Sequence, residues 1–238
     1  LAAETREVVR KVLVAGTFAP RDEILVSPEI DGLAIIELLA EEGQSVAAGQ
    51  VLARLNRVSL DVQLAQNAAT LARSDAAIAQ AQATVVEAEA NRVQAIANLQ
   101  RSETLKKSGF SSQELIDQRT ALARSTEARV EAARDALAAA RADRLASEAA
   151  RRDIEVKLAR TDIKAPRAGV INRRTAKLGA IAAMASEPLF RIIADNAIEL
   201  EAEVPEAELA LVRIGQRVEV KSANDLPAAQ GQVRLIAP

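Results

Sequence analysis

The longest pattern in the sequence is a helical one. No proline occurs between Pro28 and Pro166, and Gly109 is the only glycine within residues 57–157. Alanine, glutamate, glutamine, arginine and leucine dominate this stretch, and all five residue types favour helix. We therefore predict that residues 57–157 form two long α-helices.

The two helices are expected to form an antiparallel hairpin. The one break in the stretch is the segment 107–112, Lys-Ser-Gly-Phe-Ser-Ser. Gly109 suits the C′ position at the end of the first helix. Ser111 or Ser112 can cap the second helix, which has Glu114 in its first turn. Helices joined by so short a turn lie side by side, and at 1.5 Å per residue each reaches roughly 70 Å.

Hydrophobic residues on the first arm repeat every seven positions. The series is Leu64, Leu71, Ile78, Val85, Arg92 and Leu99, with Ala81, Ala88 and Ala95 beside it. This spacing predicts a coiled coil with small residues at the second position. We expect Arg92 to pack its stem in the seam and extend its charged head to solvent.

The second arm gives a less regular prediction. Its large apolar residues are separated alternately by seven and eight positions: Leu115, Leu122, Val130, Leu137 and Leu145. This average exceeds 3.6 residues per turn, so it does not predict a uniform left-handed supercoil. The patterns of the two arms therefore disagree.

Shorter apolar runs with turn residues flank the helical stretch. Residues 1–22 contain a β-like run, Val8–Val14, which is followed by Gly16 and Pro20. Residues 23–56 and 158–194 have the texture of short strands and tight turns. Residues 195–238 resemble part of a small mixed β-barrel, with expected elements at 197–204 (strand), 205–212 (short helix), 217–221 (strand) and 231–236 (strand).

The two strand-rich stretches, 23–56 and 158–194, repeat one another. Each carries a proline followed by a glycine, then another glycine, then a Leu-x-Arg-apolar strand. Repeats this short cannot bury an apolar face alone, so the two copies should pack together. The predicted fold class is α+β: a long antiparallel α-helical hairpin inserted between two halves of a β-sandwich and followed by a partial β-barrel.

Composition excludes several functions. Hydrophobic residues make up 49% of the chain but aromatic residues only 1%, which favours thin layers over a thick core. The 31 basic and 33 acidic residues give a net charge of −2 and no electrostatic basis for nucleic-acid binding. The chain lacks Cys and His, which removes thiol nucleophiles, His bases and the usual zinc ligands. We predict no catalytic, cofactor-binding or metal-binding residue, so the protein is not expected to be an enzyme.

The acidic residues do not change this prediction. Glu199, Glu201 and Glu203 alternate with apolar residues, which is the pattern of the solvated face of a strand. No apolar run reaches the roughly 18 residues that a membrane span needs.

The two halves resemble those of biotinyl/lipoyl-type domains. In carrier proteins of that type a tight turn with a modified lysine, usually within Met-Lys-Met, joins the halves. Here the only methionine is Met184, and the helical stretch stands where the turn would be. Split lipoyl-like halves around a coiled coil, followed by a barrel, resemble the membrane fusion (periplasmic adaptor) family of bacterial exporters, over residues 20–238.

The resemblance extends to the tip of the hairpin. Family members that dock on TolC-type outer-membrane channels carry Arg, then Leu four residues later, then Ser seven residues after that. Arg101, Leu105 and Ser112 match this spacing, and Arg101 and Leu105 share one helix face. The resemblance implies that all three bind the channel. The alternative is ordinary tip packing, with Leu105 closing the coil and Ser112 capping the second helix, and both roles are compatible.

The resemblance also implies partners and a location. The protein is expected in the periplasm, as the subunit of a tripartite efflux pump that links an inner-membrane transporter to the channel and self-associates in a hexameric ring. The expected transporter is of the resistance-nodulation-division (RND) type, with an ABC exporter of the macrolide type or a major-facilitator pump as alternatives. Residues 1–22 are expected to contribute strands to the β-barrel or membrane-proximal region, and a segment outside this sequence is expected to anchor the protein to the inner membrane.

Two other classes of protein fit less well. An enzyme-associated carrier domain would need the Met-Lys-Met site. A purely structural coiled-coil protein would have no need of a split sandwich.

Overall fold

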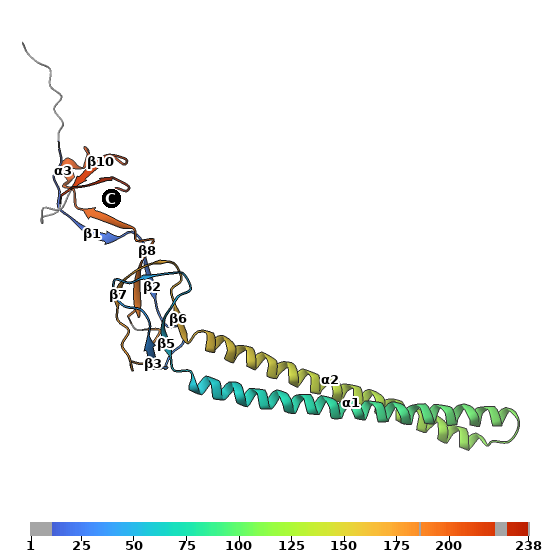
Figure 1. Cartoon of the computed structure of the whole chain (residues 1–238). Coiled ribbons are helices and arrows are strands. Elements are labelled where there is room, and N and C mark those ends of the chain that lie inside the picture. The colour runs from blue at the N-terminus through green and yellow to red at the C-terminus, as the bar shows by residue number, and fades with distance from the viewer. Residues whose placement is uncertain (1–10, 186, 222–227, 238) are drawn as a thin grey trace, which may run out of the picture.

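The computed structural model describes residues 11–185, 187–221 and 228–237. The molecule is elongated, with a β-sandwich in the middle, a helical hairpin extending from one end and a smaller β unit at the other (Figure 1). Long helices and separate β-rich parts confirm the predicted α+β fold class.

The sandwich contains two antiparallel sheets. The four-stranded sheet has the order β2 (Glu23–Val26), β8 (Phe190–Ala194), β7 (Gly169–Arg174) and β4 (Ser45–Val46). The three-stranded sheet has the order β3 (Ile35–Leu38), β5 (Val51–Leu55) and β6 (Asp162–Lys164). Each sheet takes strands from both sides of the helical insertion, so neither repeat forms a sheet by itself.

The core of the sandwich also comes from both repeats. Its largest fully buried apolar side chains are Ile35, Leu52, Leu55, Ile171, Phe190 and Ile192. Strands β7 and β8 approach closely at Gly169, where an added Cβ would lie 2.1 Å from the carbonyl oxygen of Ile193. The two halves therefore stabilise each other through one shared core.

The hairpin consists of α1 (Val58–Lys107) and α2 (Gln113–Ala159), of 50 and 47 residues. At 1.5 Å per residue these helices are about 70–75 Å long. A hydrogen bond joins the chain just before α1 to the chain just after α2, because the backbone N–H of Leu55 donates to the carbonyl of Thr161 at 2.9 Å. Thr161 is buried and its hydroxyl donates to the carbonyl of Leu158 at 2.7 Å. The hairpin thus leaves the sandwich from a fixed base.

On α1 the predicted heptad series faces α2. All its members are buried or half-buried, and so are the residues of the second position, which include Ala81, Ala88, Ala95 and Ser102. Arg92 keeps its stem in this seam while its Nη2 lies 3.7 Å from Oε1 of Glu127 on α2. The heptad prediction for α1 is confirmed. The prediction for Arg92 is confirmed only in part, because its guanidinium lies toward Glu127 and its Nε is buried without a hydrogen-bond partner.

On α2 the predicted series is wrong in part. Leu115, Leu122 and Leu145 are exposed, and only Val130 and Leu137 of the series are buried. The covered positions of the seam follow two heptad series. One is Ile116, Ala123, Val130, Leu137, Arg144 and Leu158, interrupted at Arg151, which is exposed, and the other is Arg119, Thr126, Ala133, Ala140, Ser147 and Ile154. Both arms therefore follow heptad spacing. The prediction that the two arms differ in their spacing is wrong.

Ion pairs join the two helices of the hairpin. Arg134 of α2 contacts Glu89 of α1 at 2.8 Å, and Arg144 contacts Asp75 at 2.6 Å. The hydrogen bonds to these carboxylates raise the pKa of both guanidinium groups above the ordinary value. Exposed pairs add little stability singly, but their positions favour one alignment of the arms.

The smaller β unit pairs β1 (Gly16–Pro20) with β9 (Ile198–Ala202) and β10 (Arg217–Val220) with β11 (Ala229–Gln232). A short helix, α3 (Glu206–Leu209), lies between β9 and β10. The run predicted at Val8–Val14 is wrong where it can be compared: residues 11–14 form no strand, and Val8–Arg10 lie outside the described residues. The strand starts at Gly16, where β9 comes so close that a Cβ would lie 2.6 Å from the carbonyl oxygen of Glu201, so the position suits glycine.

Two further predictions for this unit need correction. The last strand ends at Gln232 and does not reach 236. Glu199 is not simply solvated, because Arg234 holds it with two contacts of 2.6 Å and Arg21 lies 3.4 Å away. The hydrogen bonds from Arg234 and the charge of Arg21 hold the pKa of Glu199 below its ordinary value.

Candidate docking site

The turn at the tip of the hairpin closes α1 with a defined set of hydrogen bonds. The N–H of Gly109 donates to the carbonyl of Lys106 at 2.9 Å, and the N–H of Phe110 donates to that of Leu105 at 3.0 Å. Gly109 has φ 77°, a left-handed conformation that glycine adopts without strain. These bonds are those of a Schellman motif, which confirms the predicted C′ role of Gly109.

Ser112 begins α2. It has extended backbone angles, and its hydroxyl oxygen accepts a hydrogen bond from the N–H of Leu115 at 3.3 Å. This is the N-cap arrangement, which satisfies one of the free N–H groups of the first turn. The predicted capping role of Ser112 is confirmed.

Arg101 and Leu105 lie together on the exposed side of α1. They line one shallow groove of about 490 Å³ together with Ala97, Gln100 and Thr104. Ser112 is not among the residues that line this groove. The structure therefore brings two of the three predicted docking residues to one surface and places the third across the turn.

A hydrogen bond within α1 orients the guanidinium of Arg101. Its Nη2 donates to the side-chain oxygen of Asn98, one turn earlier on α1. The same oxygen lies 3.3 Å from Nε2 of Gln94. Asn98 thus orients Arg101 and leaves the remaining guanidinium donors for other contacts.

Sequence reasoning gave no role to the aromatic residue at the tip. Phe110 is 81% exposed and Leu105 is 51% exposed. Lys106 donates to the side-chain oxygen of Gln113, while Gln113 donates to Asp117 at 2.8 Å. The tip therefore combines apolar and cationic groups. A signal was present in the sequence, since Phe110 is one of only three phenylalanines.

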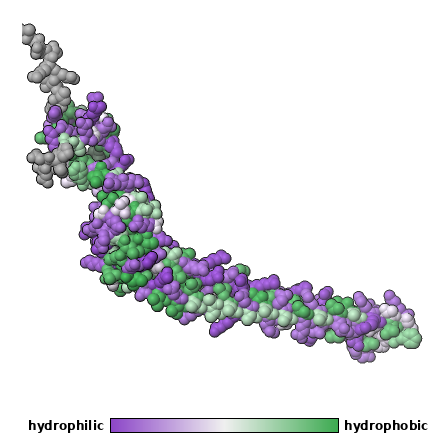
Figure 2. Space-filling model, in the orientation of Figure 1, coloured by the Kyte–Doolittle hydropathy of each residue, from purple (hydrophilic) through white to green (hydrophobic). Residues whose placement is uncertain are grey.

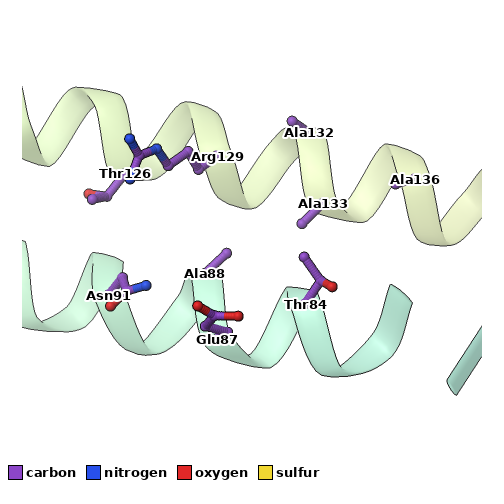
Figure 3. Close-up of a pocket in the computed structure, with 9 residues that line it drawn as sticks. All are labelled: Thr84, Glu87, Ala88, Asn91, Thr126, Arg129, Ala132, Ala133 and Ala136. Carbon is purple, nitrogen blue, oxygen red and sulfur yellow. The ribbon is translucent and has the colours of Figure 1, made fainter. Parts of the chain in front are cut away.

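A second opening lies halfway along the hairpin. It has about 420 Å³ and is lined by Thr84, Glu87, Ala88, Asn91, Thr126, Arg129, Ala132, Ala133 and Ala136. Ala133 of α2 points toward Thr84 and Ala88 of α1 (Figure 3). Such a gap is the expected result of small side chains at facing seam positions. Nothing in its lining suggests a catalytic centre.

Two further properties concern the whole described chain. In residues 11–185, 187–221 and 228–237, no group of three or more potential metal ligands gathers. No helix within these ranges is long and apolar enough to cross a membrane.

Comparisons with known proteins place the fold. No family model matches the chain. The multidrug resistance protein MdtA of Yersinia pseudotuberculosis is 24% identical over 226 residues, which cover 94% of this chain. The same match covers only 44% of MdtA, so the chain spans less than half the length of this relative.

Two solved structures are similar along the whole length of this chain. MacA from Actinobacillus actinomycetemcomitans has a TM-score of 0.57 at 18% identity, covering 95% of this chain and 66% of MacA. The periplasmic adaptor protein EmrA has a TM-score of 0.56 at 16% identity, covering 95% of this chain and 88% of EmrA. The predicted resemblance is thereby confirmed, and the chain has the fold of the membrane fusion, or periplasmic adaptor, proteins.

Proposed function

We propose that this chain is the periplasmic adaptor of a tripartite efflux system, joining an inner-membrane transporter to a TolC-type outer-membrane channel. The observation that carries the proposal is a helical hairpin of about 70 Å, which extends from a β-sandwich with a buried core and has an exposed tip. The similarity to a multidrug resistance protein and to a periplasmic adaptor protein supports it.

In the proposed mechanism the hairpin spans the distance to the channel, and its tip then contacts the channel. The root is fixed by the bond between Leu55 and Thr161, so the arm projects the tip away from the sandwich. Arg101 offers a planar set of donors that suits the free carbonyls at helix ends of a channel, and Leu105 adds apolar contact. Each tip buries little surface, so several copies must bind together to give a stable joint.

The transporter is proposed to be of the RND type, with an ABC exporter of the macrolide type as the alternative. The sequence similarity to a multidrug resistance protein supports a drug-exporting system. Co-purification of tagged protein from its native cells, followed by mass spectrometry of the inner-membrane partner, distinguishes the two.

Several copies are proposed to associate side by side through an outer face of α1. Small apolar residues recur on this face at intervals of alternately four and three residues, and the seam residues of α1 have the same spacing. They are Val58, Val62, Ala65, Ala69, Ala72, Ala76, Ala79, Ala83, Val86, Ala90, Val93 and Ala97. Each stands two residues before a seam residue, about 200° around the helix, and all but Ala97 are exposed. Apolar patches are visible along the hairpin surface between hydrophilic ones (Figure 2).

The counterpart on a neighbouring copy would be the alanine face of α2. Its exposed members are Ala121, Ala128, Ala132, Ala139, Ala142, Ala146 and Ala149. Contact of α1 from one copy with α2 from the next is heterologous, and such contacts close into rings when the rotation fits. This supports the ring that the resemblance implies.

The channel contact is tested by site-specific cross-linking. The chain has no cysteine, so Leu105→Cys introduces a single attachment point for a photo-cross-linker. We expect a cross-link to the outer-membrane channel in native cells, and its loss when Arg101→Asp is added. Arg73→Asp, another exposed arginine of α1 far from the tip, is the matched control and should leave the cross-link intact. Absence of any cross-link in the Leu105→Cys protein would refute the channel as partner.

A further inference from the structure

The three phenylalanines of this chain occupy different environments. Phe190 is fully buried in the sandwich, Phe18 on β1 is 69% exposed, and Phe110 at the tip is 81% exposed. An aromatic ring is the side chain that gains most from burial. The most exposed of the three rings belongs to the turn between α1 and α2, and this turn is the end of the hairpin remote from the sandwich (Figure 1).

The backbone presents this ring in a fixed way. On one side the Schellman bonds from Gly109 and Phe110 close α1. On the other side the hydroxyl of Ser112 caps α2. A ring on a turn fixed at both ends loses little conformational freedom on binding, which favours contact with a surface of matching shape.

Cationic residues precede the ring in the chain, and two acidic residues, Glu114 and Asp117, follow it in the first turns of α2. Lys106 and Lys107 immediately precede the turn, and Arg101 lies on the last turns of the same helix. Among the ion pairs of the described residues, none involves Arg101, Lys106 or Lys107. Unneutralised cations beside an apolar group are complementary to an apolar recess with carboxylates or free carbonyls on its rim.

We propose that Phe110 is the main apolar anchor of the tip, and that it enters an apolar recess with an acidic rim on the partner channel. This inference rests on the proposed function and adds the contact residue and the chemistry of its receptor. Lys106 and Lys107 face the rim, while Leu105 extends the apolar contact on the α1 side. Ser112 is a positioning residue, because its oxygen is already used as the cap of α2.

A protein recess fits these features better than a lipid surface. Burial of one ring is worth roughly 10- to 100-fold in affinity, and a single apolar anchor gives only marginal, reversible membrane binding. A fluid bilayer also gains nothing from the fixed geometry of the turn. A recess at the end of a channel uses both the shape and the placed charges.

The test measures binding of the whole protein to a purified TolC-type channel from the same genome in detergent. We expect Phe110→Ser to weaken binding roughly 10- to 100-fold, since that is the ratio that burial of one ring supplies. Phe110→Leu, which keeps most of the apolar surface, should stay within about fivefold of the original protein. Leu145→Ser, a change of another exposed apolar residue far from the tip, is the control and should bind normally. Circular dichroism checks that each variant keeps its helices.

Three results would overturn the proposal, each in a different way. Normal binding by Phe110→Ser together with weak binding by Arg101→Asp would remove the anchor role and leave the proposed function standing. A protein with the original sequence that does not bind the channel would remove both. Phe110-dependent binding to phosphatidylglycerol vesicles, without binding to the channel, would replace the protein recess with a lipid surface.

Discussion

The Nε of Arg144 on α2 lies 2.6 Å from Oδ1 of Asp75 on α1, and its Nη1 lies 2.9 Å from Oε1 of Glu148. Arg144 stands one heptad after Leu137, at a position where the seam would otherwise hold a leucine. The guanidinium leaves the seam at its edge, while the half-buried stem remains within it. The next residue, Leu145, therefore points away from α1.

The positions of two leucines of α2 predict a large effect on stability for one and almost none for the other. Leu137 is 7% exposed in the seam and Leu145 is 63% exposed. We expect Leu137→Ala to lower the free energy of unfolding by about 2–4 kcal/mol, because it leaves a cavity between the helices. Leu145→Ala should change it by less than about 0.5 kcal/mol. Urea unfolding followed by circular dichroism compares them, and equal losses would contradict this register.

The difference between the two arms shows what sequence patterns can predict here. On α1 the seam is filled by Leu64, Leu71, Ile78 and Val85, so a search for large apolar residues finds it. On α2 alanine, threonine and arginine fill much of the seam, and leucines such as Leu122 stand beside it. Small residues occur on several faces of these helices, so composition alone cannot choose among them. The choice requires the partner helix.

Other parts of the structure were predictable for local reasons. The proline and glycine pattern reveals the repeat, and the repeat determines that the hairpin is an insertion. Gly109 and Ser112 were predicted correctly because C′ glycines and N-cap serines act within one turn of chain. The exposure of Phe110 and the start of β1 depend on residues distant in sequence. Such features follow only from the folded structure.

Ser112 allows capping to be separated from direct contact. Ser112→Ala should cost about 1 kcal/mol of stability, because the N–H of Leu115 loses its acceptor. Ser112→Asn, which also caps, should restore both stability and channel binding. Thermal unfolding and the cross-linking assay measure the two properties. Restored stability without restored binding would show that the serine hydroxyl itself touches the partner.

The pairing of Glu199 predicts an effect of acid on the smaller β unit. Its pKa is lowered by the hydrogen bonds from Arg234 and by the charge of Arg21, so the folded carboxylate holds protons less tightly than the unfolded one. The stabilisation is present above the ordinary carboxyl pKa of about 4.3 and is lost as pH falls through the lower folded value. We expect β1 and β9 to open more readily as pH drops from about 5 to about 3.

Substitution of Glu199 isolates this effect from the titration of other carboxylates. Glu199→Gln should lower the stability of the β1–β9 pair above pH 5, and it should reduce the further loss of stability as the pH falls. Glu201→Gln, in the same strand but without these partners, is the control. Hydrogen exchange of residues 16–20 and 198–202, with each variant compared at the same pH, gives the readout. Identical acid profiles for the two variants would mean that the pair with Arg234 does not stabilise the strands.

The outer face of α1 predicts a separation of folding from association. Ala83→Glu and Val93→Glu place charges on exposed positions, so each monomer should keep its helices and nearly its full stability. If a second copy packs there, the carboxylate is buried without a partner and association should weaken at least tenfold. Gln80→Glu, on a neighbouring exposed face, adds the same charge and should associate normally.

Sedimentation velocity over a range of concentrations measures this association. Normal association of both the Ala83 and Val93 variants would show that this face of α1 is free in the assembly. Loss of association in Gln80→Glu as well would show a general effect of charge. Weakening restricted to Ala83→Glu and Val93→Glu assigns the contact to this face, because all three changes add one carboxylate to an exposed position of the same helix.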